Sequence, residues 1–390
     1  MTDPGAAEAE PTGLPVTGAW RVGDPPGDRR FAAIGATPLE WAPPIPGVVL
    51  AYETWGTFTG DNAVLVEHAL TGDAHVVGEP GPGQATGGWW EGLIGPGLAV
   101  DTDRWYVVAP NALGGCGGST GPSSPRPSAR SAGGDSGWAP ATAWGSRFPR
   151  ITIRDQVAAE LQLAAALGID RWALVLGGSM GGMRALEWAI MAPSSVQRLM
   201  LLATGAAATA EQIALCSAQI AAIKADPHWR GGDYYDEPDG PAVGMGIARR
   251  IAHISYRGAR ELEQRFGRSP QNGESPERGG RYAIESYLDH QAAKLARRFD
   301  AGSYVTLSEA MNSHDVGRGR GGLAAALGEV TARTAVVSID TDRLYRPRQQ
   351  AELAEGISGA ELITVHSPYG HDGFLLEIEA ISAALRALLG

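Results

Sequence analysis

Short apolar runs recur along the chain and alternate with segments whose apolar residues have helical spacing. The clearest runs lie at residues 63–70, 104–110, 171–176, 198–204, 334–339 and 361–367. Runs that are apolar at nearly every position are typical of parallel strands buried on both faces. The alternation therefore predicts an α/β fold with a mostly parallel sheet and helices on both faces.

The segment before the third run shows both boundaries of a helix. Thr152 and Asp155 have the spacing of a capping box, and Gly168 stands where a helix commonly ends in glycine. Between them, Val157 and Leu161 belong to an apolar stripe. We predict a helix between Thr152 and Gly168.

One long segment, residues 206–328, interrupts this alternation with helical patterns and no convincing strand. We expect it to be a helical insertion into an α/β core formed by residues 21–205 and 329–390. Residues 1–20 have the composition of a flexible leader. Residues 123–144 are rich in Pro, Gly and Ser, which predicts a long surface loop.

The charge of the chain limits its classes of partner. The 390 residues carry a formal net charge of −11, which argues against a nucleic-acid ligand, because phosphate backbones are bound by clustered Lys and Arg. Arginines do gather between Arg249 and Arg298. Glutamates such as Glu261 and Glu277 interleave with them, which indicates a solvated helical surface.

Cysteine content and hydropathy indicate the compartment. Cys116 and Cys216 are the two cysteines of the chain, so a disulfide framework is not expected and a reducing environment fits. The first residues lack the basic and apolar regions of a signal peptide, and no apolar run is long enough to cross a membrane. We expect a cytoplasmic protein.

The pentapeptide Gly177-Gly178-Ser179-Met180-Gly181 lies between a predicted strand and a predicted helix. It matches the G-x-S-x-G nucleophile elbow, in which glycines make room for a sharp turn that exposes the serine hydroxyl. The pattern alone fits a plain Gly-rich turn equally well. As an elbow, it makes Ser179 the nucleophile and aims the Met180 backbone N–H at a developing oxyanion.

A serine nucleophile needs an acid and a histidine, which follow it in that order in such folds. Asp340 and Asp342 both follow the fifth apolar run, and the pattern leaves the choice between them open. Two histidines compete for the role of base. His366 stands at the end of the sixth run, whereas His371 follows in a loop flanked by glycines, so we favour His371. The second oxyanion donor is expected to be the backbone N–H of Leu70.

The remaining histidines show no ligand-like spacing with one another, with cysteines or with carboxylates, so we predict packing or surface roles and no metal site. They are His68, His75, His228, His253, His290 and His314. Cys116 lies in a Gly-rich loop and is expected to be a structural thiol rather than a nucleophile.

Eight dispersed segments of the chain carry a family resemblance. They are HALTGDAHV (68–76), GWWEGLIGPGLAVDTDRW (88–105), PNALGGCGGSTGPSS (110–124), TIRDQV (152–157), GGSMGGMRALEW (177–188), DPHWRGGDYY (226–235), TDRLY (341–345) and GHDGFLLE (370–377). Together they resemble homoserine O-acetyltransferases, a family of the α/β-hydrolase superfamily. The resemblance covers nearly the whole chain after the leader. It implies the α/β-hydrolase fold with a helical lid at 206–328, through which two subunits form a homodimer.

The resemblance also implies an activity, the transfer of an acetyl group from acetyl-CoA to L-homoserine in two steps, in methionine biosynthesis. Acetyl-CoA is then a co-substrate, and no permanently bound cofactor is expected. The implied catalytic triad is Ser179, Asp342 and His371, which decides between the two aspartates.

By position, the resemblance assigns Arg249 to the homoserine carboxylate, and Tyr256 and Asp372 to its ammonium group. A bidentate arginine suits a carboxylate entering a dry pocket. Arg250 is the adjacent rival for the same role.

A few positions depart from the family pattern and leave the acyl preference open. Gly117 and Arg184 stand where the family commonly has Gln, and residues 215–220 are less polar than usual. Homoserine O-succinyltransferase and serine O-acyltransferase activities remain alternatives, and an esterase or thioesterase is a more distant one. A succinyl donor needs an additional cation near the acyl pocket, for which Arg184 is one candidate.

Overall fold

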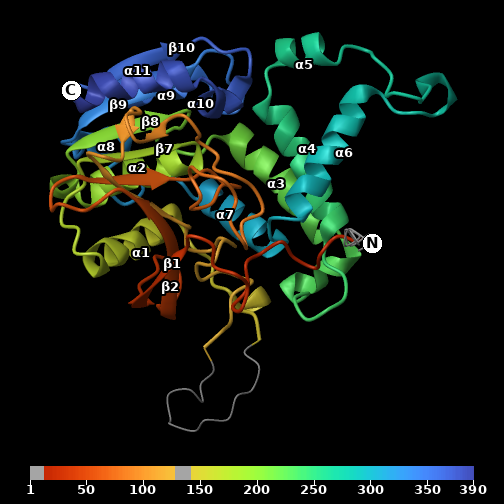
Figure 1. Ribbon diagram of the computed structural model, residues 1–390, viewed down its shortest axis with the longest axis horizontal. Helices are drawn as coiled ribbons and strands as arrows, with labels where there is room; N and C mark the ends of the chain where they lie inside the picture. The colour runs from red at the N-terminus through yellow and green to blue at the C-terminus, as the bar shows by residue number, and fades with distance from the viewer. Residues whose placement is uncertain (1–12, 128–141) are drawn as a thin grey trace, which may run out of the picture.

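The computed structural model describes residues 13–127 and 142–390, and an eight-stranded sheet lies at its centre (Figure 1). The strands are β1 (Arg30–Thr37), β2 (Ile45–Trp55), β3 (Ala63–Glu67), β6 (Tyr106–Pro110), β7 (Leu174–Gly178), β8 (Arg198–Leu202), β9 (Arg333–Ile339) and β10 (Glu361–Val365). Their order in the sheet is β1-β2-β6-β3-β7-β8-β9-β10. The short strands β4 (Ile94–Gly95) and β5 (Val100–Asp101) pair separately.

All six predicted strands are present, and they form the parallel part of the sheet. The sequence pattern did not indicate β1 and β2, which pair antiparallel with each other and join the sheet through β6. Both strands contain short apolar stretches, at 31–34 and 48–52, but they follow each other without an intervening helical pattern, so the alternation did not single them out. The predicted mostly parallel α/β fold is confirmed.

Hydrophobic side chains cover both faces of the sheet. In β3, Leu65 points into one core, whereas Val64 and Val66 point into the other. In β7, Val175 likewise faces the opposite side to Leu174. Because successive strand residues alternate between faces, a strand buried on both must be apolar throughout.

Helices from the parallel part of the chain cover the two faces. They are α1 (Ile153–Ala166), α2 (Met180–Met191), α9 (Pro347–Gly356), α10 (Gly373–Leu376) and α11 (Ile378–Leu389). The predicted helix between Thr152 and Gly168 is α1. Its capping box is formed, with the Asp155 amide donating to Thr152 Oγ1 at 3.2 Å and the Thr152 amide donating to Asp155 at 2.8 Å.

Between β8 and β9 the chain leaves the sheet and forms helices. These are α3 (Ala210–Lys224), α4 (Ala242–Tyr256), α5 (Ala259–Arg265), α6 (Ala283–Ala296), α7 (Ala301–Asn312) and α8 (Leu323–Gly328). Figure 1 shows α4, α5 and α6 on the side of the molecule away from α1 and the strands, with α3 and α7 nearer the sheet. The insertion therefore stands against the edge at which the parallel strands end.

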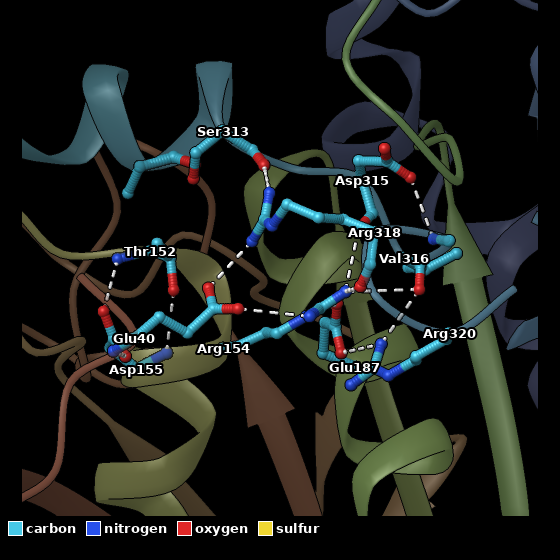
Figure 2. A network of polar contacts seen from close by, with 12 residues as sticks. Glu40, Thr152, Arg154, Asp155, Glu187, Ser313, Asp315, Val316, Arg318 and Arg320 are labelled. Carbon is cyan, nitrogen blue, oxygen red and sulfur yellow. Dashed lines mark hydrogen bonds and ion pairs between the residues drawn. The ribbon is translucent and has the colours of Figure 1, made fainter. Parts of the chain in front are cut away.

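A network of polar contacts fastens the end of this insertion to the core (Figure 2). Arg154 of α1 donates through Nη2 to the backbone carbonyls of Asp315, Val316 and Arg318, at 3.0, 3.3 and 2.8 Å. Glu187 of α2 is almost fully buried and pairs with Arg154 at 3.0 Å and with Arg320 at 2.8 Å. The returning chain is thus tied to α2, the helix that directly follows Ser179.

The first 12 residues of the predicted leader, and residues 128–141 of the predicted surface loop, lie outside the described part of the chain. No helix within the described ranges combines the length and the apolar character that a membrane crossing requires.

Candidate active site

Ser179 occupies the sharp turn between β7 and α2. Its φ of 57° and ψ of −123° lie outside the regions that a residue with a side chain ordinarily adopts. The surrounding glycines allow this turn: a Cβ on Gly181 would collide with the carbonyl oxygen of Glu67, and one on Gly177 would collide with the Gly181 backbone. The turn is fixed by hydrogen bonds from the Ser179 amide to the Leu202 carbonyl, at 3.0 Å, and from Thr204 Oγ1 to the Ser179 carbonyl, at 2.9 Å.

The Ser179 hydroxyl lies at the end of a chain of three side chains. His371 Nε2 is 2.9 Å from Ser179 Oγ, and His371 Nδ1 is 2.7 Å from Asp342 Oδ2. The other carboxylate oxygen of Asp342 accepts from the amides of Leu344 and Tyr345, at 2.8 and 2.9 Å. In this arrangement the imidazole donates its Nδ1–H to the Asp342 carboxylate, and Nε2 is free to accept the serine proton.

The rival residues form a pair of their own. His366 Nδ1 is 2.8 Å from Asp340 Oδ2, and the His366 side chain is 85% exposed. Asp342 and His371 are both buried. The structure therefore brings together the aspartate that the family resemblance selects and the histidine that the loop pattern favours, and it places the other two residues on the surface.

Aromatic rings enclose the imidazole. Tyr345 stacks on His371 with ring centroids 5.1 Å apart, and Phe374 meets it edge-on at 5.3 Å. The Tyr256 ring lies on another side at 5.7 Å. Burial raises the pKa of the Tyr256 phenol to about 12, so this group stays protonated and can donate a hydrogen bond near the imidazole.

The two predicted oxyanion donors border the same site. Met180 is the first residue of α2, so its amide has no partner within the helix. Leu70 lines the cavity together with Ser179. Neither amide hydrogen-bonds to an acceptor in the described part of the protein, which leaves both free for a ligand oxygen.

A cavity of about 230 Å³ opens in front of Ser179. Three arginines line it, Arg249, Arg257 and Arg298. The interpretation of the 249–298 arginines as a solvated surface is therefore wrong for these three. Arg257 does have a glutamate partner, since Glu261 pairs with it at 2.6 Å. The three guanidinium groups nevertheless face the cavity, from α4, from the link between α4 and α5 and from the link after α6.

The three residues assigned to the substrate by resemblance all line this cavity, namely Arg249, Tyr256 and Asp372. Arg250, the rival of Arg249, faces away and pairs with Asp289 of α6. Asp372 is not isolated, because Arg257 Nη1 lies 3.3 Å from its carboxylate. Neither Arg257 nor Arg298 was predicted to be a site residue. The alternation of Arg and Glu in this segment suggested that both were exposed to solvent.

Arg184 does not reach the cavity. It is fully buried behind the elbow helix and pairs with Glu67 and with Glu160, the latter at 2.5 Å. Burial raises the pKa of the Glu67 carboxyl well above its ordinary value. This arginine thus supports the packing of α2, and it lines neither the cavity in front of Ser179 nor the smaller one beside it.

Two further sequence predictions concern possible ligands. Burial strongly raises the pKa of the Cys116 thiol, which keeps it protonated and agrees with a structural role. In the described residues, Asp28, Glu53 and His75 come within 4.8 Å of one another, a grouping that sequence spacing did not reveal. Both ring nitrogens of His75 are engaged, Nδ1 with Glu53 at 2.8 Å and Nε2 with the Gly78 carbonyl at 3.0 Å, and Asp28 is exposed.

Known proteins share both the fold and the sequence. Residues 62–378 match the alpha/beta hydrolase fold family. The homoserine O-acetyltransferase of Thermobifida fusca is 62% identical over 381 residues, covering 96% of this chain and 97% of the relative. A crystal structure of homoserine O-acetyltransferase from Bacillus anthracis has a TM-score of 0.82 at 26% identity, covering 93% of this chain and 97% of the other.

A neighbour with a different name is equally similar in structure. The crystal structure of esterase E22 has a TM-score of 0.82 at 25% identity and covers 93% of this chain and 99% of the esterase. The two crystal structures do not decide between these names, since both are about equally identical to this chain, at 26% and 25%. The 62% identity to the Thermobifida fusca homoserine O-acetyltransferase, over nearly the full length of both chains, shows the family. The chain belongs to the homoserine O-acetyltransferase family within the alpha/beta hydrolase fold.

Proposed function

We propose that this protein transfers the acetyl group of acetyl-CoA to the hydroxyl of L-homoserine, giving O-acetyl-L-homoserine and CoA, as a step of methionine biosynthesis. The observation that carries the proposal is the hydrogen-bonded chain from Asp342 through His371 to Ser179, at 2.7 and 2.9 Å, inside a cavity lined by arginines. Family membership supplies the donor and the acceptor.

In the first half-reaction, His371 Nε2 takes the proton of Ser179 as its Oγ attacks the thioester carbonyl. The amides of Leu70 and Met180 stabilise the tetrahedral oxyanion. Collapse of this intermediate breaks the carbon–sulfur bond, and the CoA thiolate receives the proton from His371. The product is an acetyl ester on Ser179.

In the second half-reaction, His371 removes the proton of the homoserine hydroxyl, whose oxygen attacks the acetyl ester. Collapse of the second intermediate gives O-acetylhomoserine and returns the proton from His371 to Ser179 Oγ. Arg249 holds the acceptor carboxylate, while Tyr256 and Asp372 face its ammonium group. Because water competes for the same ester, transfer depends on holding the acceptor at high effective concentration in a closed pocket.

A second, smaller cavity supports acetyl rather than succinyl as the acyl group. It holds about 20 Å³, adjoins the first through Leu70 and Tyr256, and is bordered by Tyr345. That volume suits about one methyl-sized group. Among the described residues, none of the side chains lining it carries a charge, so a succinyl carboxylate would be unpaired there.

The insertion acts as a lid in this proposal, and two subunits associate through it. On α4, the side chains of Val243, Ile247 and Ile254 are 71%, 47% and 51% exposed. An apolar stripe of this kind on an exposed helix is typical of an interface. A second copy of the chain is the proposed occupant. Since both substrates are metabolites of the cytoplasm, we also propose that compartment.

The first experiment is to follow CoA release from acetyl-CoA and from succinyl-CoA, with homoserine, with serine and without acceptor. We expect turnover that requires acetyl-CoA and homoserine and disappears in Ser179→Ala, whereas the exposed Ser194→Ala behaves as wild type. Turnover that does not depend on an acceptor would show that the protein is a hydrolase, like its esterase neighbour. A preference for succinyl-CoA would show that the acyl group is succinyl rather than acetyl. Unchanged activity in Ser179→Ala would contradict the mechanism.

A further inference from the structure

The charges that line the catalytic cavity are not balanced. Of its three arginines, Arg257 is neutralised by Glu261 and Asp372, at 2.6 and 3.3 Å. Within residues 13–127 and 142–390, neither Arg249 nor Arg298 has a carboxylate within 4.0 Å of its guanidinium nitrogens. Among the described residues, Arg249 and Arg298 therefore face the cavity without a carboxylate in ion-pair contact, and the charge of Asp73 acts on Arg298 only from beyond 4.0 Å.

These two side chains come from different elements and meet at one residue. Arg249 of α4 donates through Nη1 to Thr71 Oγ1 at 3.3 Å. Arg298, in the link between α6 and α7, donates through Nη1 to the Thr71 carbonyl at 2.8 Å. Thr71 follows Leu70, whose amide is the proposed oxyanion donor. The cationic pair is thus anchored next to the reacting centre.

The environment of Arg298 favours an anion. Burial lowers the pKa of its guanidinium, and the positive charge of Arg249 lowers it further. Two cations in a poorly hydrated cavity destabilise each other, and a bound anion relieves both penalties at once. A guanidinium carries five N–H donors in a planar fork, so each has donors left after its contact with Thr71.

Resting on the proposed function, we propose that Arg298 is a second carboxylate-binding residue of the acceptor site. Together with Arg249 it forms a two-arginine clamp on the carboxylate of the acceptor amino acid. Position favours this anion over a CoA phosphate, because the long pantetheine arm separates the phosphates from the thioester, whereas a short carbon chain separates the carboxylate of homoserine from its hydroxyl. The clamp makes Arg298 a determinant of specificity for amino-acid acceptors.

The test compares two acceptors, homoserine and propanolamine, which is homoserine without its carboxylate. For Arg298→Met we expect kcat/KM for homoserine to fall roughly 100-fold, while kcat/KM for propanolamine changes less than about 3-fold. For Arg298→Lys, which keeps a charge but loses the fork, we expect a loss of about 10-fold with homoserine alone. The neighbouring exposed Arg297→Met is the matched control and keeps wild-type values.

A control measures the rate at which acetyl-CoA acetylates Ser179 in the absence of acceptor. We expect this rate to stay within about 3-fold of wild type in each variant, which would show that the donor site is folded. If Arg298→Met slows this step or raises the KM for acetyl-CoA instead, the residue binds the donor and the inference is wrong. Equal losses with both acceptors also contradict it. A wild-type enzyme without homoserine-dependent turnover would refute the proposed function itself, which is a distinguishable result.

Discussion

His366 Nδ1 lies 2.8 Å from Asp340 Oδ2 at the same sheet edge where His371 Nδ1 lies 2.7 Å from Asp342 Oδ2. The two pairs contain the same residue types and come from the same two segments of chain, which follow β9 and β10. They differ in burial, since the side chain of His366 is 85% exposed and that of His371 is 4% exposed. The inner pair alone contacts a nucleophile.

This duplication provides a matched test of the acid. Asp342→Asn keeps the shape of the side chain but removes the charge that fixes the imidazole tautomer, so we expect kcat to fall on the order of ten-thousand-fold. Asp340→Asn removes an exposed pair and should leave kcat within about 2-fold of wild type. Steady-state kinetics with acetyl-CoA and homoserine measure both. Similar losses in the two variants would show that the aspartates do not have separate roles.

The two pairs also mark where prediction from sequence ends. Five of the six predicted strands were predictable because burial on two faces requires continuous apolar runs, whereas β10 is a largely exposed edge strand whose run is apolar only in part. The elbow was predictable because its glycines have a steric reason. The choice between Asp340 and Asp342 depends on how the chain turns after β9, which the local pattern does not encode. The family resemblance, rather than periodicity, resolved it.

Arg298 illustrates a different kind of limit. Interleaved Arg and Glu residues usually lie on a solvated helix face. Here Arg257 uses Glu261 as a partner while facing the cavity, and Arg298 points inward from the link after α6. The direction of a side chain in a helical insertion depends on how the helices pack on the sheet, and this packing brings together residues distant in sequence.

The buried group of Arg184, Glu67 and Glu160 predicts an effect on stability without an effect on donor choice. Arg184→Gln removes the cation and leaves two carboxyl groups buried, so we expect the free energy of unfolding to fall by roughly 3–5 kcal/mol. Denaturant titration measures this loss. The ratio of acetyl-CoA to succinyl-CoA turnover should stay at its wild-type value, and a shift toward succinyl-CoA would show that Arg184 contacts the acyl group after all.

His68 predicts an acid-dependent loss of stability. Its Nε2 accepts a hydrogen bond from the Ala112 amide at 3.0 Å, and burial, with Arg184 nearby, lowers its pKa to about 3. Between pH about 6.5 and about 3 the unfolded chain therefore binds a proton at His68 that the folded protein does not. Stability should fall with decreasing pH through this window, with His68 contributing about 1.4 kcal/mol per pH unit.

His68→Gln keeps a donor and an acceptor but does not titrate. We expect the slope of unfolding free energy against pH to decrease by about one proton in this variant, measured by denaturant titrations between pH 4 and 6 (roughly the middle of the window). His253 and His314, whose pKa values burial also lowers, to about 3 and about 4, keep the rest of the slope. An unchanged slope would show that His68 is protonated in the folded state.

Helix α4 has two functional faces in the proposed enzyme, and the last prediction separates them. One face carries Arg249 and Tyr256 toward the cavity, and the other exposes Val243 and Ile247. Glutamates at both exposed positions would place charges in an apolar dimer contact, so Val243→Glu with Ile247→Glu should convert a dimer into a monomer by sedimentation velocity. Leu362→Glu, at an exposed site on β10, is the control and should remain dimeric.

The same double variant should raise the KM for homoserine. If the partner subunit holds α4 in place, loss of the partner makes α4 more mobile and weakens the binding of the carboxylate by Arg249. Acetylation of Ser179 depends on α2 and the Asp342 loop, so we expect it to continue. A monomer with an unchanged KM would show that the sheet alone positions α4. A wild-type protein that sediments as a monomer would refute the homodimer outright.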